Sequence, residues 1–170
     1  MNDMLFAPTP KAGAALPIPS EYDTLMIVTF QIGHQQYSLP VAAVCEVVRL
    51  SALVTLVGAA PALCGLLNLR GLYLPVFDGR LLVGEAAGYD LSKQIVIVGR
   101  VRPELGVIVD QVHGVVRRGG VSSAPLARPL AGTLIESVCE ADHGSIIGIS
   151  LTALLALTAQ AAPVVTVPVD

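Results

Sequence analysis

The segment GLLNLRGLYLPVFDGR, residues 65–80, is an apolar stretch interrupted by four strongly polar side chains: Asn68, Arg70, Asp78 and Arg80. In a chain with 54% hydrophobic and only 14% charged residues, such groups need a structural or functional reason. Pro61 and the following ALCGLLN predict a short helix over residues 61–69, with proline in its first turn. A strand is predicted over residues 71–77, so Arg70 would lie at the corner between helix and strand.

Two interpretations of this corner follow from the residues alone. In the structural one, Asn68 caps the helix, Arg70 bonds the last carbonyls or pairs with Asp78, and Gly71 eases the turn. In the functional one, Arg70 is surrounded by Leu and Val and offers a charge-assisted donor to a partner protein. Both interpretations are open at this point.

Composition limits the classes of partner and cofactor. The chain has 170 residues, a net charge of −3 and no basic run longer than Arg117-Arg118, so we expect no nucleic-acid partner. Its cysteines, Cys45, Cys64 and Cys139, are odd in number and lack CxxC spacing. This pattern fits a reducing compartment, and we expect no metal, redox site or cofactor.

Two long uncharged runs, residues 50–69 and 144–169, raise the alternative of a membrane span. Proline, glycine and polar residues interrupt both, so we expect no direct membrane insertion. The opening stretch MNDMLFAPTPKAGAALPIPS holds four prolines and lacks the basic start and compact apolar block of an export signal. We therefore expect a cytoplasmic protein whose residues 1–23 form a flexible tail rich in proline and alanine.

Runs rich in valine and isoleucine predict a mainly β fold, in small barrels or a sandwich. Besides residues 71–77, strands are expected at residues 25–32, 37–41, 44–50, 94–101, 105–112, 133–140 and 145–151. Residues 33–36 would turn between the first two of these strands. A helix is expected at residues 151–158.

The chain also resembles itself when its second half is aligned with its first. Residues 36–49 and 104–117 share five of fourteen aligned positions, and the context of both segments is a strand followed by a polar turn. Four of the five identities are valine on valine, so chance is an alternative explanation. We predict two related half-domains joined by the exposed loop of residues 84–93.

Catalytic motifs are missing from the sequence. It contains no GxxxxGK[ST], GxGxxG, HExxH or GxSxG pattern, and His34, His113 and His143 lack a nearby nucleophile motif. Asp110 lies in the apolar run LGVIVDQV without a second carboxylate beside it, so a strand-end or turn position is expected. An interaction module is therefore favoured over an enzyme of unrecognised type.

The pattern P-x-x-x-G-x-x-N-L-R-G-x-x-x-P-V-x-D-x-R, residues 61–80, resembles the CheW-like chemotaxis coupling family. The flanking segments FQIGHQQYSLPVAAVCEVVR and QIVIVGRVRPELGVIVDQVHGVV resemble its two hairpins, so the likeness covers about residues 25–157. It implies two five-stranded SH3-like barrels with a shared hydrophobic core. The domain would span residues 24–158, with subdomains at about 24–84 and 92–150, a helix at about 151–158 and a tail at 159–170.

The resemblance also implies a function. Members of the family are non-enzymatic adaptors that join methyl-accepting chemoreceptors to the histidine kinase CheA. The implied partners are the cytoplasmic hairpin tip of the receptor, the regulatory domain of CheA and further copies of the chain in array rings. The protein would be cytoplasmic and recruited to membrane-associated receptor arrays. The alternative is an adaptor of the same fold in a non-flagellar pathway such as pilus-based motility.

Site residues follow from the resemblance, position by position. The receptor-binding groove would involve Val44, Glu46, Gly65, Asn68, Arg70 and Ile95. The turn and motif positions would be Gly71, Pro75, Asp78 and Arg80. A helical hairpin in an apolar groove needs a few polar groups to set its register, and an acid and an arginine supply them. The chain departs from the family at Gly79, usually leucine, where we expect the loss of a buried side chain.

Overall fold

The computed structural model describes residues 26–88, 90–117, 122–125, 134–141 and 143–161. The predicted mainly β fold is confirmed. The described strands are β1 (Met26–Ile32), β2 (Gln35–Pro40), β3 (Val44–Arg49), β4 (Leu63–Leu69), β5 (Leu72–Asp78), β6 (Gln94–Val98), β7 (Leu105–Val109), β8 (Gln111–Arg117), β9 (Ser122–Pro125), β10 (Ile135–Ala141) and β11 (Gly144–Ile149). The described helices are η1 (Val41–Ala43), α2 (Gly79–Leu82) and α3 (Leu151–Ala161). The predicted flexible tails fall outside the described residues, apart from the last turn of α3.

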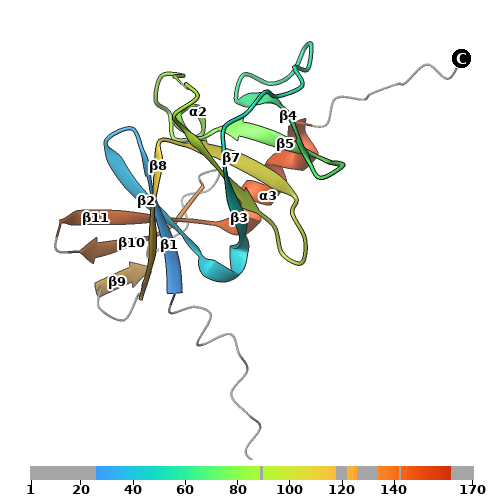
Figure 1. The fold of residues 1–170 in the computed structure, drawn as a ribbon. Helices are drawn as coiled ribbons and strands as arrows, with labels where there is room; N and C mark the ends of the chain where they lie inside the picture. The colour runs from blue at the N-terminus through green and yellow to red at the C-terminus, as the bar shows by residue number, and fades with distance from the viewer. Residues whose placement is uncertain (1–25, 89, 118–121, 126–133, 142, 162–170) are drawn as a thin grey trace, which may run out of the picture.

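The strands form two sheets (Figure 1). One has six strands in the order β8-β1-β2-β11-β10-β9, and the other has five in the order β3-β6-β7-β5-β4. Both are mixed, because β11 lies parallel to β2 in the first and β5 parallel to β7 in the second, while the other pairings are antiparallel.

The two halves of the chain repeat one set of pairings. The strands β1 to β5 of the first half have β6, β7, β8, β10 and β11 as their counterparts, in this order, in the second half. Exchanging every strand with its counterpart turns the five-stranded order into β8-β1-β2-β11-β10, which is the six-stranded sheet without β9. The topology therefore supports the internal repeat predicted from the sequence. Chance matching of valines does not account for a shared pairing order.

The sheets do not follow the expected division of the chain near residues 84–92. The first hairpin of each half lies in a sheet with the other half's remaining strands: β1–β2 lies between β8 and β11, and β6–β7 lies between β3 and β5. We call this arrangement the strand exchange. Each sheet is therefore completed only by a hairpin from the other half.

The predicted helix over residues 61–69 is wrong, because this segment is strand β4. Burial alternates along it, with Leu63, Gly65 and Leu67 buried, and it pairs with β5. A period of two indicates a strand, whereas a short apolar run alone fits either element. Pro61 lies in the turn before the strand.

The predicted strand over residues 105–112 is divided. β7 ends at Val109 and β8 begins at Gln111, with Asp110 between them, which agrees with the strand-end position expected for this acid. The short elements α2, η1 and β9 were not predicted. The other predicted strands, and the helix from Leu151, agree with the structure to within a few residues.

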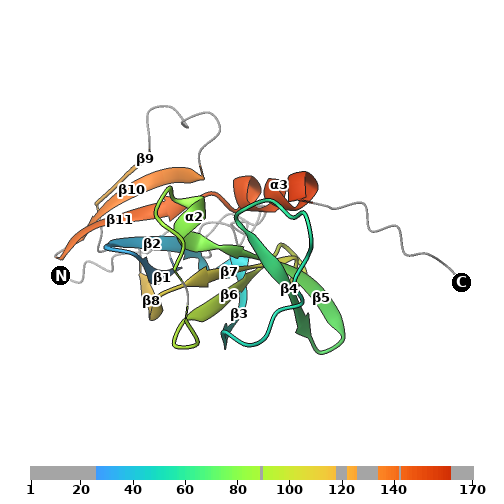
Figure 2. The same cartoon turned by 90° about the horizontal axis from the view of Figure 1, so that it is seen from above.

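The main apolar core lies between the two sheets. It includes Phe30 and Leu39 of the six-stranded sheet, Val96 and Val98 of β6, and Leu154 of α3. Figure 2 shows α3 lying across the junction between the sheets. The alternate side chains of the five-stranded sheet form a second cluster, which includes Leu67, Leu74, Val76, Ile95, Ile97 and Ile108.

Candidate protein-docking site

An exposed ion pair joins the two edges of the five-stranded sheet. Arg70 donates from Nη1 and Nη2 to the two carboxylate oxygens of Glu46, at 2.9 and 2.8 Å. Glu46 lies on β3 and Arg70 at the end of β4, and these are the two edge strands. The side chain of Arg70 is 76% exposed and that of Glu46 26%. We call this pair the Glu46–Arg70 fork.

The fork orients Arg70 more than it stabilises the fold. Exposed ion pairs contribute little to stability, because water screens them. A bidentate arginine–carboxylate pair nevertheless fixes the plane of the guanidinium. The hydrogen bonds that Arg70 donates to Glu46, and then the charge of Glu46, raise the pKa of Arg70, so the group stays cationic. The result is a charged donor held at a defined angle on the surface.

The backbone around Arg70 is a tight hairpin turn, so the predicted corner between helix and strand is wrong. Arg70 has a φ of 51° and Gly71 a φ of 87°, and two successive positive values are typical of a type I′ turn between β4 and β5. The Oδ1 atom of Asn68 accepts a hydrogen bond from the Gly71 amide at 2.8 Å. Asn68 therefore supports the turn and caps no helix.

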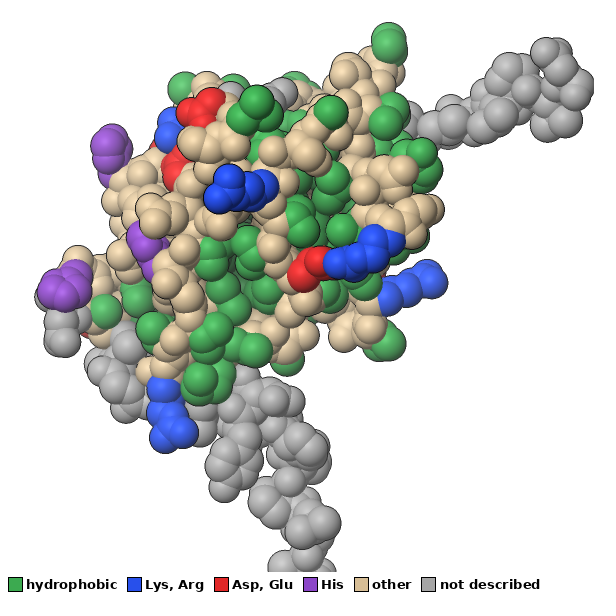
Figure 3. Space-filling view, viewed as in Figure 1, with side chains coloured by type: hydrophobic (Ala, Val, Ile, Leu, Met, Phe, Trp, Pro, Cys, Tyr) green, Lys and Arg blue, Asp and Glu red, His purple; other side chains and the backbone are tan. Residues whose placement is uncertain are grey.

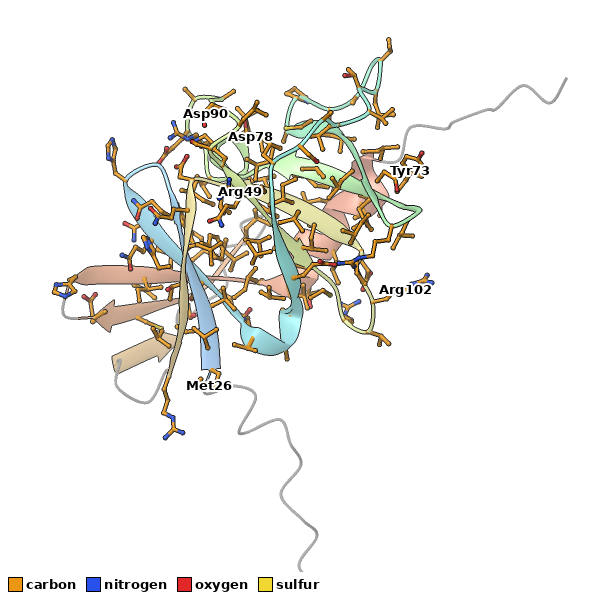
Figure 4. All side chains as sticks on the ribbon, viewed as in Figure 1. Met26, Arg49, Tyr73, Asp78, Asp90 and Arg102 are labelled. Carbon is orange, nitrogen blue, oxygen red and sulfur yellow. The ribbon has the colours of Figure 1, made fainter. Side chains whose placement is uncertain are left out.

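Apolar side chains are exposed on the same elements. Val47 of β3 is 37% exposed, and Leu72 and Tyr73, which follow the turn, are 43% and 56% exposed. Val54, 52% exposed, lies in a segment that bridges to β4 at Leu66. Figure 3 shows few charged side chains on this view, set among many hydrophobic ones, and Figure 4 shows Tyr73 pointing away from the body of the molecule. A cationic donor with exposed apolar neighbours is typical of a protein-docking surface.

A model of the CheW-like domain family matches residues 26–157. The chain belongs to the CheW-like domain family. It is 31% identical over 103 residues to the chemotaxis protein CheW of Bacillus subtilis (strain 168), a match that covers 58% of this chain and 65% of that relative. It is 27% identical over 90 residues to the chemotaxis protein CheW of Rhizobium meliloti (strain 1021), covering 52% of this chain and 58% of the relative. The matches thus span less than two thirds of either relative.

The CheW-like fold also matches a solved structure, the scaffolding protein TtCheW from Thermoanaerobacter tengcongensis. The TM-score is 0.65 at 26% sequence identity, and the match covers 75% of this chain and 89% of that chain. The architecture of two sheets and few helices is therefore that of a CheW-like domain.

Two of the predicted groove residues of this CheW-like domain lie beneath the surface. Ile95 has no exposed area and packs in the second apolar cluster, so the expected direct contact is corrected to a supporting position under β3. Gly65 is also buried. A Cβ atom on it would lie 2.5 Å from the Val54 carbonyl oxygen, so glycine allows the bridging segment to approach β4. Val44 is half-buried at the start of β3.

The motif residues after the hairpin have structural positions. Pro75 is half-buried opposite Leu66 of β4. Asp78 does not pair with Arg70. Instead, its Oδ1 atom accepts a hydrogen bond from the Arg80 amide at 2.9 Å and caps α2. Arg80 pairs with Asp110 at 3.1 Å.

Gly79 leaves no gap where the family has leucine. It is buried, and a Cβ atom on it would lie 2.3 Å from the Ile108 carbonyl oxygen. The backbone of β7 therefore occupies the space, and the expected packing defect is corrected to a close approach of α2 to β7.

The described residues hold no group of metal ligands and no membrane-spanning helix. In that part of the chain, His, Cys, Asp and Glu side chains do not gather in groups of three that would hold a metal ion. No helix there is long and apolar enough to cross a bilayer.

Proposed function

We propose that this CheW-like protein is a non-enzymatic adaptor that couples methyl-accepting chemoreceptors to the histidine kinase CheA. The observation that carries the proposal is the Glu46–Arg70 fork beside exposed apolar side chains. Family membership and the chemotaxis names of the relatives support it. The partner at the fork is the helical hairpin tip of the receptor's cytoplasmic region.

The fork provides both parts of such a contact. Leu72 and Tyr73, which follow Arg70 in the chain and are exposed, supply apolar surface whose burial favours association. A guanidinium has five N–H donors, and Glu46 accepts from two of its nitrogen atoms, so further donors of Arg70 point to a partner oxygen. Glu46 sets the direction of these donors, and Asn68 and Gly65 hold the strands beneath them.

The second partner is the regulatory domain of CheA, and the protein acts in the cytoplasm at membrane-associated receptor arrays. Further copies of the chain join it in array rings. The adaptor carries no chemistry of its own: its output is the placement of the kinase relative to the receptor.

A pull-down with a purified receptor signalling fragment tests the proposal. Arg70→Glu places a second acid beside Glu46 and removes the donor, so we expect binding to weaken by at least about tenfold. Arg117→Glu is the matched control, because Arg117 is an exposed arginine at the end of β8, on the other sheet. Undiminished binding by Arg70→Glu, or an equal loss of binding in both variants, would contradict receptor docking at the Glu46–Arg70 fork.

A further inference from the structure

Asp110, at the crossover from β7 to β8, bonds to elements of both sheets. Its carboxylate accepts a hydrogen bond from the Gly33 amide at 2.6 Å, in the β1–β2 turn of the six-stranded sheet. It pairs with Arg80 of α2, at 3.1 and 3.2 Å, and with the Nζ atom of Lys93, just before β6. Its own amide donates to the Gln31 carbonyl at 2.9 Å. We call Asp110, Arg80 and Lys93 the crossover cluster.

The crossover cluster is largely enclosed. The exposed fractions of the side chains are 17% for Asp110, 10% for Lys93 and 33% for Arg80. One carboxylate thus faces two cations in a setting with little water. Removing its charge would leave Lys93 and Arg80 without a directly bonded acid among the described residues, which is unfavourable for partly enclosed groups.

The cluster connects the end of β3 with the start of β8. Just after β3, the Leu50 amide donates to the Lys93 carbonyl at 3.0 Å. The Lys93 side chain then binds Asp110, and β8 begins at the next residue. This path from β3 to β8 runs through one backbone hydrogen bond and one ion pair, and beside it the Val112 amide of β8 donates to Oε1 of Gln94, at the start of β6, at 2.7 Å.

Around this path the strand ends are not packed together. A hollow of about 500 Å³ is lined by Arg49, Leu91, Ser92, Gln94, Asp110 and Gln111. Figure 4 shows Arg49 in the region between β3 and β8. At this hollow, the ion pair of Lys93 with Asp110 thus joins the start of β6 to the start of β8, where apolar side chains do not pack between them.

The other crossover, from β2 to β3, is held differently. In the alignment of the two halves, Asp110 corresponds to Ala42, in the η1 helix between β2 and β3. There a backbone hydrogen bond from Gly99 to the Ala43 carbonyl, at 3.1 Å, holds the chain. The β2–β3 crossover is therefore held without an ion pair at the position equivalent to Asp110, so the crossover cluster is particular to the β7–β8 crossover.

The equivalent strands β3 and β8 carry matching exposed surface. Val47 of β3 corresponds to Val115 of β8 in the same alignment, and these are 37% and 54% exposed. Val116, beside Val115, is 40% exposed. β3 lies at the proposed receptor-docking edge of one sheet, whereas β8 is an edge strand of the other.

We propose that Asp110 is a positioning residue that fixes β8 relative to β3, so that receptor docking at β3 is transmitted to a kinase-facing edge at β8. The inference rests on the proposed function for the identity of the two partners. The fixed relation between the strands rests on the crossover cluster and on the hydrogen bond from the Val112 amide to Gln94 beside it. Docking at either edge needs only that edge, whereas coupling needs both edges held together.

The test is Asp110→Asn, which keeps an acceptor for the Gly33 amide and removes the charge facing Lys93 and Arg80. We expect receptor-fragment binding within about twofold of wild type, because the Glu46–Arg70 fork is untouched. Receptor control of CheA activity in a reconstituted array should fall by at least about fivefold. Amide hydrogen exchange across residues 111–117 should speed up by at least about tenfold, with residues 63–78 unchanged.

Asp90→Asn is the matched control. Asp90 is close enough to Lys93 and Arg80 for their charges to lower its pKa, after the larger effect of hydrogen bonds from Ser92 in its own loop. It carries the same charge as Asp110, and its carboxylate bonds within its own loop instead of to the crossover, so Asp90→Asn should behave as wild type. The double variant Asp110→Asn with Lys93→Met also removes the Lys93 cation, one of the two left without their acid, but it does not restore the ion pair between Lys93 and Asp110. It should recover stability and stay uncoupled.

Several outcomes would overturn the inference: normal coupling by Asp110→Asn, unchanged exchange in β8, or restored coupling in the double variant. Parallel loss of receptor binding, coupling and folded fraction by circular dichroism would also overturn it, since that marks general destabilisation. If wild type itself fails to couple receptor to kinase, the proposed function is wrong, and the exchange of β8 in Asp110→Asn still decides whether the cluster fixes the strand.

Discussion

At the scale of single residues, Arg70 combines two unusual features. It is a non-glycine residue with a positive φ, 51°, and its guanidinium forms a bidentate pair with an acid on another strand. The left-handed backbone costs free energy, which the turn and Asn68 offset locally. A lysine at this position would keep the charge and lose the planar two-point contact with Glu46.

Gly65 gives a prediction about stability. Gly65→Ala would bring a Cβ atom to 2.5 Å from the Val54 carbonyl, at a φ of 151° that favours glycine. We expect the free energy of unfolding to fall by about 1–3 kcal/mol, measured by urea denaturation. Gly88→Ala is the control, because its Cβ would have only an ordinary contact at 3.5 Å and should cost less than about 0.5 kcal/mol. Equal effects of both variants would contradict the close approach of residues 51–57 to β4.

Cys64 gives a prediction about pH. Burial, and then the charge of Asp78, raise the pKa of this thiol from 9.0 to about 11. Above about pH 9 the unfolded chain therefore loses the thiol proton before the folded chain does, and the free energy of unfolding falls between about pH 9 and 11. Tyr37, whose pKa burial also raises, acts in the same direction. Urea denaturation at pH 8 to 11 should show a shallower decline for Cys64→Ala than for wild type, and parallel declines would contradict the role of Cys64.

The sequence was informative about which polar residues matter and less so about their partners. Glu46 and Arg70 were each expected at the docking site, but 24 positions separate them and no local pattern pairs them. Asp78 was the nearer acid, yet it caps α2. Ile95 was placed at the docking site by the family resemblance alone, and the apolar residues on both faces of β6 gave no alternation that would have shown its burial.

At the scale of elements, α3 ties the two sheets together through buried leucines. Leu154→Ala removes a side chain that is 1% exposed in the main core, and we expect a loss of about 2–5 kcal/mol in the free energy of unfolding. Thr152→Ala, at an exposed position of the same helix, is the control and should stay within about 0.5 kcal/mol of wild type. Thermal and urea denaturation measure both. A loss below about 1 kcal/mol for Leu154→Ala would show that α3 is dispensable to the core.

Element prediction failed where one residue changes the course of a strand. Asp110 lies inside an apolar run that favours one continuous strand, but the chain turns there from one sheet to the other. In β4, the proline before the segment and its leucines suited a helix as well as a strand. The pairing with β5 decides the strand, and pairing partners are tertiary information that local propensity lacks.

At the scale of the whole molecule, the strand exchange makes a prediction about fragments. Chains covering residues 1–88 and 90–170 should each hold only part of both sheets, because β1 and β2 pair with strands of the second half and β6 and β7 with strands of the first. We expect them to be poorly folded alone and to form a stable one-to-one complex when co-expressed. Co-purification through a tag on one fragment, followed by circular dichroism of the complex, measures this. Two separately folded fragments without affinity for each other would contradict the exchange.

The strand exchange also has a consequence for synthesis on the ribosome. The six-stranded sheet joins β1, which begins at Met26, with β11, which ends at Ile149, so its hydrogen bonds cannot close until almost the whole chain has emerged. The nascent β1–β2 hairpin must wait with its apolar side chains uncovered, a state prone to aggregation and a natural substrate for chaperones. A long delay between translation of the first hairpin and burial of its side chains is thus built into the order of the strands.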